Sequence, residues 1–261
     1  MRLSLIITTY NWPESLELVL KSIECQTITP EEVIIADDGS TFETKALFSR
    51  FQQDSELNII YSWQEDKGFR AAKSRNKAIV KSNTNYIVLI DGDMILHPRF
   101  IEDHISNAKS GYFVQGSRVL LTQNKTKRVL DQQKINFSFF SIGLRNRQNA
   151  LYSSFLSTLM SRDKNFLGGI KSCNMAFFKQ DCINVNGFNN DFNGWGREDS
   201  EFIVRLFNNG IRRKSLHFNA IQYHLWHNEN KNTLISRNDA ILQHALFNRL
   251  QWCDNGIDRY L

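Results

Sequence analysis

Tyr86-Ile-Val-Leu-Ile-Asp-Gly-Asp93 joins an apolar run to two carboxylates that stand one residue apart. Residues 86–90 have the composition of a buried strand, and a strand that ends in two anionic side chains is costly unless a cation neutralises them. Hard oxygen ligands select magnesium or manganese. The stretch therefore predicts a divalent metal site for a phosphate-bearing ligand, although Asp-Gly-Asp is also ordinary turn chemistry after a strand.

The composition is that of one globular domain, or of one domain with a small appendage, in 261 residues. A net charge of +5 favours acidic partners such as nucleotide phosphates, anionic lipid or nucleic acid. The basic residues are not interleaved with stacking aromatic residues, so we do not expect nucleic-acid binding. The cysteines form no CxxC pair, which argues against a zinc knuckle or a redox motif and favours reduced cysteines. No apolar run has the length of a signal peptide or a membrane span. We expect a cytoplasmic protein, with at most peripheral contact to the inner face of the cytoplasmic membrane.

Short apolar runs alternate with helical patterns in the first half of the chain. Residues 3–7, 33–36, 59–63 and 86–90 are typical of strands, and a helix follows Asn11 as its N-cap with Pro13 in its first turn. This alternation predicts an α/β fold with a Rossmann-like, mainly parallel central sheet flanked by helices. Ligands bind beyond the carboxyl ends of such strands. Residues 8–11, 37–40 and 91–93 are polar and follow three of the strands, so we expect one ligand site at this edge.

Two further clusters suggest how a nucleotide is held. Asp37 or Asp38 could accept a hydrogen bond from an imide N–H such as N3 of uracil, while the other caps a helix that begins near Thr41. Arg70 and Arg75 stand at the start of a helix, where a diphosphate could bind. The alternative for these arginines is an ordinary solvated helix surface.

Asn193-Gly-Trp-Gly-Arg-Glu-Asp-Ser-Glu201 opens another helix, whose apolar face predicts burial. Asp199 lies along that face, and the helix dipole favours its charged form, which makes it a candidate general base. Glu198 could bind an acceptor hydroxyl, and Trp195 between two glycines suggests an exposed ring that stacks on a sugar. The alternative is that acidic residues merely decorate a helix start.

His224 and His227 are candidates for completing the metal site. A strand would put them on opposite faces, whereas a turn would bring them together. We expect one of them, His227 ahead of His224, to bind the metal with Asp91 and Asp93. The alternative is a packed core histidine.

Two regions lie outside these motifs. Residues 120–147 are polar and basic with weak periodicity, and we expect a mobile surface loop there, with a phosphate-binding or lipid-facing role as the alternative. Residues 236–252 have the pattern of a closing amphipathic helix.

Three motifs together resemble the inverting family-two nucleotide-sugar glycosyltransferases, which have the GT-A fold. They are Ser4-Leu-Ile-Ile-Thr-Thr-Tyr-Asn11, Ile34-Ile-Ala-Asp-Asp-Gly-Ser40 and Leu89-Ile-Asp-Gly-Asp93. The segments 166–170, 186–188 and 194–199 are similar to galactosyltransferases, N-acetylgalactosaminyltransferases and bacterial chondroitin-type polymerases. The resemblance covers residues from about 2 to 227, and this chain has Ser200 where related galactosyltransferases have another aspartate.

The resemblance implies roles for individual residues. Asp199 would be the catalytic base. The acceptor would contact Trp195, Arg197 and Glu198. Mn²⁺, or Mg²⁺, would be held by Asp93 and Asp91 of the DXD motif with His227 or His224. The residues implied for a UDP-sugar donor are Thr8, Tyr10, Asp38, Arg70, Arg75, Asp91 and Gly169.

The resemblance also implies an activity and a domain division. We expect inverting transfer of a hexose or N-acetylhexosamine from UDP-Gal or UDP-GalNAc, with UDP-GlcNAc as a further candidate. The acceptor would be a saccharide or lipid-linked oligosaccharide in surface polysaccharide or glycolipid synthesis. Residues 1–228 would form the catalytic domain, with a donor half at 1–118, a mobile basic insertion at 119–150 and an acceptor half at 151–228, and residues 229–261 a helical extension.

Two other functions fit part of the pattern. A catalytically silent nucleotide- or carbohydrate-binding protein could retain the fold. A sugar-nucleotide nucleotidyltransferase would also place an acidic metal site on a parallel sheet, but it usually has a glycine-rich basic loop after its first strand, and residues 8–13 contain none.

Overall fold

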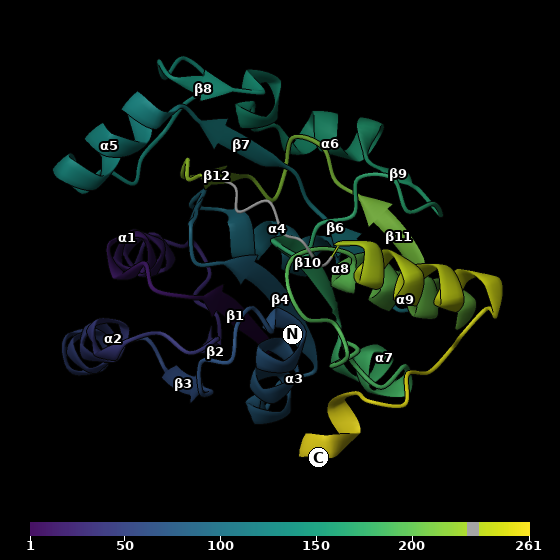
Figure 1. Ribbon diagram of the computed structural model, residues 1–261. Helices are drawn as coiled ribbons and strands as arrows, with labels where there is room; N and C mark the ends of the chain where they lie inside the picture. Colours follow the sequence, from purple (N-terminus) through teal and green to yellow (C-terminus); the bar gives the residue numbers. More distant parts are fainter. Residues whose placement is uncertain (229–234) are drawn as a thin grey trace.

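The computed structural model describes residues 1–228 and 235–261, and within them an eight-stranded sheet forms the centre of the molecule (Figure 1). Its strand order is β3-β2-β1-β4-β10-β6-β11-β9. β1 (Leu3–Thr9) pairs in parallel with β2 (Glu32–Asp37) and β4 (Tyr86–Asp91), and β2 pairs in parallel with β3 (Ile59–Trp63). The four predicted strands are confirmed, and β1, β2 and β4 are almost entirely buried, as expected for parallel strands covered on both faces.

The other half of the sheet mixes strand directions. β10 (Asn174–Phe178) runs antiparallel to both β4 and β6 (Tyr112–Gln115), and β6 is parallel to β11 (Arg212–Ser215). The short β9 (Arg162–Asp163) closes this edge antiparallel to β11. The sheet is therefore mixed but mainly parallel, as the sequence predicts.

Helices cover both faces of the sheet. One core contains apolar residues of α1 (Pro13–Glu24), α2 (Phe42–Asp54) and α4 (Phe100–Asn107), packed on β1, β2 and β4. The opposite core contains residues of α3 (Ala71–Lys81), α7 (Lys179–Asn184) and α8 (Glu198–Asn208). The helix predicted after residues 193–201 is thus confirmed as α8, and its apolar side is buried.

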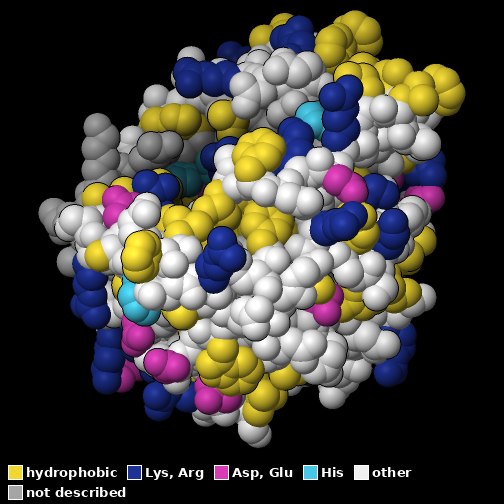
Figure 2. All heavy atoms as spheres, turned by 90° about the vertical axis from the view of Figure 1, so that its right-hand side faces the viewer, with side chains coloured by type: hydrophobic (Ala, Val, Ile, Leu, Met, Phe, Trp, Pro, Cys, Tyr) yellow, Lys and Arg dark blue, Asp and Glu magenta, His cyan; other side chains and the backbone are white. Residues whose placement is uncertain are grey.

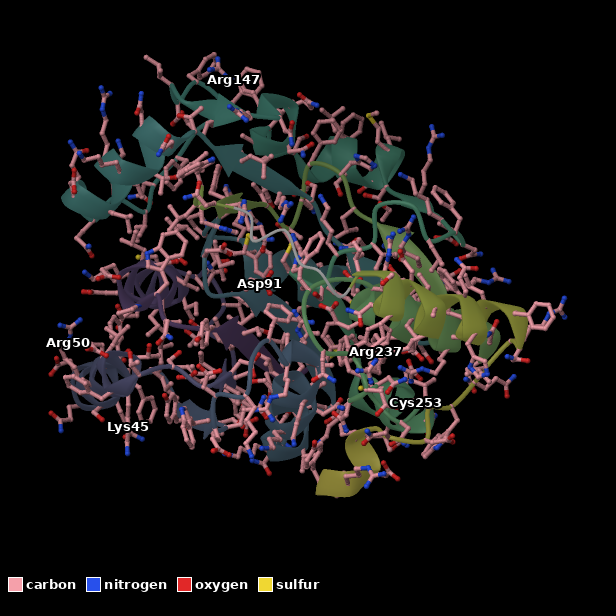
Figure 3. The ribbon with its side chains drawn as sticks, viewed as in Figure 1. Lys45, Arg50, Asp91, Arg147, Arg237 and Cys253 are labelled. Atoms are coloured by element: carbon pink, nitrogen blue, oxygen red, sulfur yellow. The ribbon has the colours of Figure 1, made fainter. Side chains whose placement is uncertain are left out.

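A second, four-stranded sheet, which the sequence does not predict, includes parts of residues 120–147, where the sequence predicts a loop. It joins β5 (Met94–Leu96), β12 (Gln222–His224), β7 (Arg118–Leu121) and β8 (Leu144–Arg145). This region also contains α5 (Gln123–Gln132), η1 (Arg147–Ala150) and, just beyond it, α6 (Ser154–Met160). The loop prediction is wrong because α5 buries only Thr126 and Val129, too few residues to produce a visible helical pattern. Arg147 lies at the outer edge of this layer, away from the centre of the molecule (Figure 3).

Asn11 does not cap the first helix. The N-cap of α1 is Trp12, which makes no side-chain cap hydrogen bond, and Asn11 has a positive φ of 46°. The Oδ1 atom of Asn11 instead accepts from the backbone N–H of Thr41, 2.8 Å away, immediately before α2. The side chain therefore connects the ends of two strands rather than stabilising its own helix.

The C-terminal segment packs on the rest of the molecule. α9 (Ile235–Phe247) lies against α8, where Leu242 and Ala245 meet Val204, and Ile257 at the start of η2 (Ile257–Tyr260) belongs to the core around α3. The predicted closing helix is confirmed, although it ends at Phe247. The domain boundary predicted after residue 228 falls next to residues 229–234, which lie outside the described residues. Within the described ranges no helix is both long enough and apolar enough to cross a bilayer.

A buried ion pair fixes α8 to the loop after α7. Glu201 and Arg205 are 1% and 0% exposed, and two hydrogen bonds of 2.8 and 2.7 Å join their side chains. Arg205 also donates to the carbonyls of Val185 and Gly187. Because α8 begins with Glu198 and Asp199, this pair sets where those carboxylates lie.

We predict that Glu201→Ala lowers the free energy of unfolding by about 3 kcal/mol or more, because it leaves the Arg205 charge buried without a partner. Urea denaturation would measure the change. Glu102→Ala is the matched control, since Glu102 pairs with Arg99 at the surface, where solvent screens the charges and the pair stabilises the fold far less. Equal losses from the two substitutions would contradict this role for the buried pair.

Candidate functional site

A cavity of about 650 Å³ opens at the carboxyl ends of β1, β2 and β4, where the sequence predicts the ligand site. Figure 3 shows Asp91 in the middle of the molecule, at the end of β4. Most of the residues predicted from the sequence line this cavity; they are Thr8, Tyr10, Asp38, Arg75, Asp91, Asp93, Trp195, Arg197, Glu198, Asp199 and His227.

A tight turn between β4 and β5 presents the two aspartates. The backbone N–H of Gly92 donates to the carbonyl of Thr8 at 2.8 Å, and Ser15 Oγ donates to the carbonyl of Gly92 at 2.5 Å. A Cβ atom at residue 92 would lie 2.9 Å from the Thr9 hydroxyl, so only glycine fits without displacing β1. At this turn the side chains of Asp91 and Asp93 point apart: Asp91 contacts Arg75, and Asp93 contacts two histidines.

Asp93 lies against both histidines. Its Oδ2 atom is 3.0 Å from Nε2 of His224 and 3.2 Å from Nε2 of His227, and the three possible ligand atoms lie within 4.8 Å of one another. β12 pairs with β5 so that His224 stands opposite Met94, and the backbone N–H of Leu225 donates to the carbonyl of Asp93 at 3.0 Å. The structure brings both histidines to the site, whereas the sequence predicts that only one of them is used.

The electrostatics of Asp93 suit a cation. Burial alone would raise its pKa, but hydrogen bonds from His224 and His227 outweigh that effect and hold the pKa at about 2. Its Oδ1 atom is buried and has no hydrogen-bond partner in the described part of the chain. Two imidazole nitrogens and a carboxylate fit manganese better than magnesium, because magnesium prefers an all-oxygen shell.

Asp91 lies outside this three-residue cluster. Its Oδ1 atom is 3.5 Å from Nη2 of Arg75, and burial raises the pKa of its carboxyl group even though Arg75 opposes the shift. The assignment of Asp91 as a metal ligand is therefore not supported by the cluster, and contact with the ribose remains a prediction.

Arg75 joins four elements at the floor of the cavity. It is 3% exposed, and it donates from Nε to the Thr8 hydroxyl at 3.2 Å and from Nη1 to Glu198 Oε1 at 3.1 Å, in addition to its contact with Asp91. Burial alone would lower the pKa of Arg75, but Glu198 and Asp91 together raise it. Glu198 is buried by this pairing, and its Oε2 atom has no partner among the described residues, which leaves one oxygen available to a hydroxyl.

Asp199 faces the same cavity from the first turn of α8. Its Oδ1 atom accepts from the backbone N–H of Ser200 at 2.7 Å. Burial and the neighbouring Glu198 raise the pKa of Asp199 to about 7, although Arg75 opposes the shift. The expectation that the helix dipole keeps Asp199 fully charged is wrong, because burial beside another carboxylate outweighs the dipole. A carboxylate with this pKa is well matched to act as a base near neutral pH.

The Trp195 loop is held by α9. The ring of Trp195 is 58% exposed, and the flanking Gly194 and Gly196 have positive φ values of 76° and 101°, which other residues rarely adopt. Asn238 of α9 donates to the carbonyls of Asn193 and Gly196. Arg197, a predicted acceptor contact, forms a 2.5 Å ion pair with Asp239 of α9. The prediction that Trp195 is exposed is confirmed, and the contacts with α9 hold the loop that carries it.

The two aspartates at the end of β2, Asp37 and Asp38, have different roles in the structure. Asp37 accepts from the backbone N–H groups of Gly39 and Ser40 and from the Tyr61 hydroxyl, so it closes the turn before α2 and does not cap the helix. Asp38 faces the cavity, and its two oxygens accept from Gln64 Nε2 and from the backbone N–H of Arg70, both at 2.6 Å. Burial raises the pKa of Asp38.

Some predicted residues do not line the cavity, and some lining residues were not predicted. The side chain of Arg70 donates to the carbonyl of Glu65, outside the cavity, and Gly169 lines a second cavity. His224 reaches the site through Asp93. The unpredicted lining residues include Trp12, Phe69, Arg118 and Lys171. Trp12 and Lys171 directly follow predicted motifs, whereas Arg118 carries no local signal and reaches the site only through the pairing of β7 with β12.

Sequence comparisons identify relatives. A family model described as "Glycosyl transferase family 2" matches residues 4–183, and one described as "N-terminal domain of galactosyltransferase" matches residues 158–228. A chondroitin synthase of Escherichia coli is 28% identical over an alignment 249 residues long, which covers 85% of this chain and 34% of that protein. A hyaluronan synthase of Pasteurella multocida is 29% identical over 232 residues, 82% of this chain and 24% of that protein. The chain thus spans about a third of the first protein's length and about a quarter of the second's.

Solved structures share the fold at low sequence identity. S. aureus TarS 1-349 in complex with UDP superposes with a TM-score of 0.64 at 16% identity, over 100% of this chain and 68% of that chain. A mannosyltransferase from Pyrobaculum calidifontis in complex with GDP-Man and Mn²⁺ gives 0.59 at 17%, over 92% and 61%. These likenesses confirm the predicted GT-A fold. With a family model that matches more than half of its length, the chain belongs to glycosyl transferase family 2.

Proposed function

We propose that this protein transfers a hexose or N-acetylhexosamine from a UDP-sugar to a saccharide acceptor, with inversion at the anomeric carbon and with the help of a divalent metal. The observation that carries the proposal is that one cavity combines a buried carboxylate, Asp199, with the cluster of Asp93, His224 and His227. A base and a site for a charged leaving group are the two components that such a displacement needs.

The donor site is supported by the edge of the parallel sheet. Thr8, Tyr10 and Asp38 line the cavity at the ends of β1 and β2, where we place the uridine. Asp91 at the end of β4 is the candidate ribose contact. Structures of TarS with UDP and with UDP-GlcNAc show that a protein with this fold binds such ligands.

The metal would be held by Asp93, His224 and His227, and we infer Mn²⁺ ahead of Mg²⁺ from the two nitrogen ligands. When bound, the ion neutralises the diphosphate of the departing UDP. The orphaned Oδ1 atom of Asp93 also fits a cation at this point.

The acceptor would enter beside the Trp195 loop. Its ring offers an exposed apolar face for a sugar, and Glu198 Oε2 offers an acceptor for a hydroxyl. Asp199 removes the proton from the attacking hydroxyl, whose oxygen forms the new bond to the anomeric carbon as the bond to UDP breaks. Attack from the face opposite to the leaving group inverts the linkage.

The comparisons support a proposal for the transferred sugar and for the acceptor class. The match to a galactosyltransferase domain over residues 158–228 favours UDP-Gal or UDP-GalNAc, with UDP-GlcNAc as the next candidate. The chondroitin and hyaluronan synthases among the relatives favour a polysaccharide acceptor. A lipid-linked oligosaccharide in surface polysaccharide or glycolipid synthesis belongs to the same class.

We predict that Asp199→Asn lowers the transfer rate by about 10²- to 10⁴-fold, because the amide cannot take the acceptor's proton. The affinity for UDP changes little, since Asp199 does not touch the metal cluster. Transfer is measured as UDP release with a saccharide acceptor, and UDP binding by calorimetry. Asp181→Asn on α7 is the matched control and keeps its activity. An equal loss of transfer and UDP binding would count against Asp199 as the base.

The activity should also depend on pH. At pH values below its pKa of about 7, Asp199 is protonated and cannot act as a base. We therefore expect kcat/KM to fall roughly tenfold for each pH unit below that pKa and to level off at higher pH. A profile of kcat/KM between about pH 5 and pH 9 tests this. An acidic limb near the ordinary aspartate pKa of 3.8 would show that burial does not control the residue.

We further predict that His224→Ala and His227→Ala each raise, by about tenfold or more, the Mn²⁺ concentration that gives half of the thermal stabilisation by UDP. Each substitution removes one nitrogen ligand. His244→Ala on α9 is the control and should behave as the unaltered protein. If only one of the two substitutions has an effect, the result would support the prediction from the sequence that a single histidine binds the metal.

A further inference from the structure

A second cavity, of about 220 Å³, adjoins the one that holds the proposed active site. Arg118, Lys171 and Cys173 line both cavities, so these residues form a shared wall. The two cavities differ in charge. The first contains several carboxylates, whereas the described lining of the second contains none.

Four cationic side chains line the second cavity. Arg118 comes from β7, Lys164 follows β9, Lys171 precedes β10, and Arg213 belongs to β11. Within residues 1–228 and 235–261, none of the four has a carboxylate partner within 4.0 Å. Such a gathering of like charges is unfavourable unless an anion joins it.

The tertiary structure holds these charges in place. Arg213 is 2% exposed and donates to the carbonyls of Lys164 and Gly168, at 3.1 and 3.0 Å, which fixes the wall of the cavity. Arg118 has a buried Nε–H without a partner among the described residues. Partial burial and repulsion from Arg118 lower the pKa of Lys171, and burial lowers that of Arg213. A bound anion would relieve both effects.

The position of the cavity indicates which substrate brings the anion. Lys171 lines both cavities, and Asp199 is close enough to act on the pKa of Lys171. The metal cluster at Asp93, which is the proposed place of the donor diphosphate, lines only the first cavity. A molecule whose hydroxyl reaches Asp199 would therefore present its neighbouring group on the Lys171 side, toward the second cavity.

We propose that the second cavity is an anion subsite for the acceptor, which carries a carboxylate or phosphate group next to the sugar that is attacked. The cations would bind this group, and the hydroxyls of Ser117 and Ser215 in the same lining would bind the sugar that carries it. This inference rests on the proposed function, because it assumes that the neighbouring site binds an acceptor.

The basic surroundings agree with this assignment. Figure 2 shows the side of the molecule that carries β9, β11 and α9, and Lys and Arg side chains are prominent over its upper half, beside hydrophobic ones. A negatively charged acceptor would be attracted to this side of the protein.

The test compares charged and neutral sugars on the full chain with UDP and Mn²⁺ present. Methyl β-D-glucuronide tests a carboxylate, glucose 1-phosphate tests a phosphate, and methyl β-D-glucoside is the neutral reference. Dissociation constants are measured by ligand-observed NMR. We expect at least one charged probe to bind about tenfold more tightly than the reference, a difference of about 1.4 kcal/mol. A preference for one charged probe over the other identifies the group.

Lys164→Gln combined with Lys171→Gln should abolish the preference for the charged probe. Among the described residues these two lysines make hydrogen bonds only through their backbones, so the fold should persist, and an unchanged melting temperature would verify this. Lys214→Gln is the matched control and should keep the preference, because Lys214 alternates with Arg213 and Ser215 on β11 and points to the other face of the sheet.

Three results would overturn the subsite: equal binding of charged and neutral probes, weaker binding of the charged probe with UDP present than in a matched sample without UDP, or a preference that survives the double substitution. UDP binding is measured on the same samples. Absence of UDP binding would overturn the proposed function, whereas UDP binding without a preference for charge would overturn only the anion subsite.

Discussion

The buried guanidinium of Arg75 makes the interactions on which the arrangement of the larger cavity depends. It connects Thr8 on β1, Asp91 on β4 and Glu198 on α8, and its own helix, α3, packs on the sheet between them. A buried charge without partners costs several kcal/mol, so each of these groups is needed where it stands. The consequence is that the side of the cavity built from residues 8–91 and the side built from the start of α8 are held in one arrangement by a single side chain.

The same network controls the chemistry of the neighbouring carboxylates. Glu198 forms an ion pair with Arg75. Asp199, one residue later, is buried beside Glu198, and Arg75 offsets only part of the cost of its charge, so the pKa of Asp199 rises to about 7. The pKa of Asp93 is instead lowered, because His224 and His227 donate hydrogen bonds to its carboxylate. Aspartates in one cavity thus acquire different properties: one suited to proton transfer and one permanently anionic and ready for a cation.

Charge also separates the two cavities. The acidic groups collect at the carboxyl edge of the parallel strands, where β1, β2 and β4 end, and the cations collect where β7, β11 and the segment before β10 meet. Lys171 and Arg118 stand between them. Under the proposed function, a substrate that contacts both cavities would be oriented by both sets of charges, which would help the protein to choose among acceptors.

The sequence by itself determined the parallel strands and the helix that begins within residues 193–201, because continuous apolar runs and helical periodicity are local signals. It also determined the exposed Trp195 and most residues of the cavity, because polar residues at strand ends and glycines around an aromatic residue are local signals as well. It missed the second sheet, because strands of two to four residues are too short to show a period, and it missed α5, which buries only Thr126 and Val129. It also misplaced the Asn11 bond, which joins residues 30 positions apart. Only the tertiary structure decided that both His224 and His227 meet Asp93, that Arg75 pairs with Glu198, and that burial overrides the helix dipole at Asp199. These outcomes depend on which distant segments pack together and on how much water that packing excludes, and no local pattern of residues encodes either quantity.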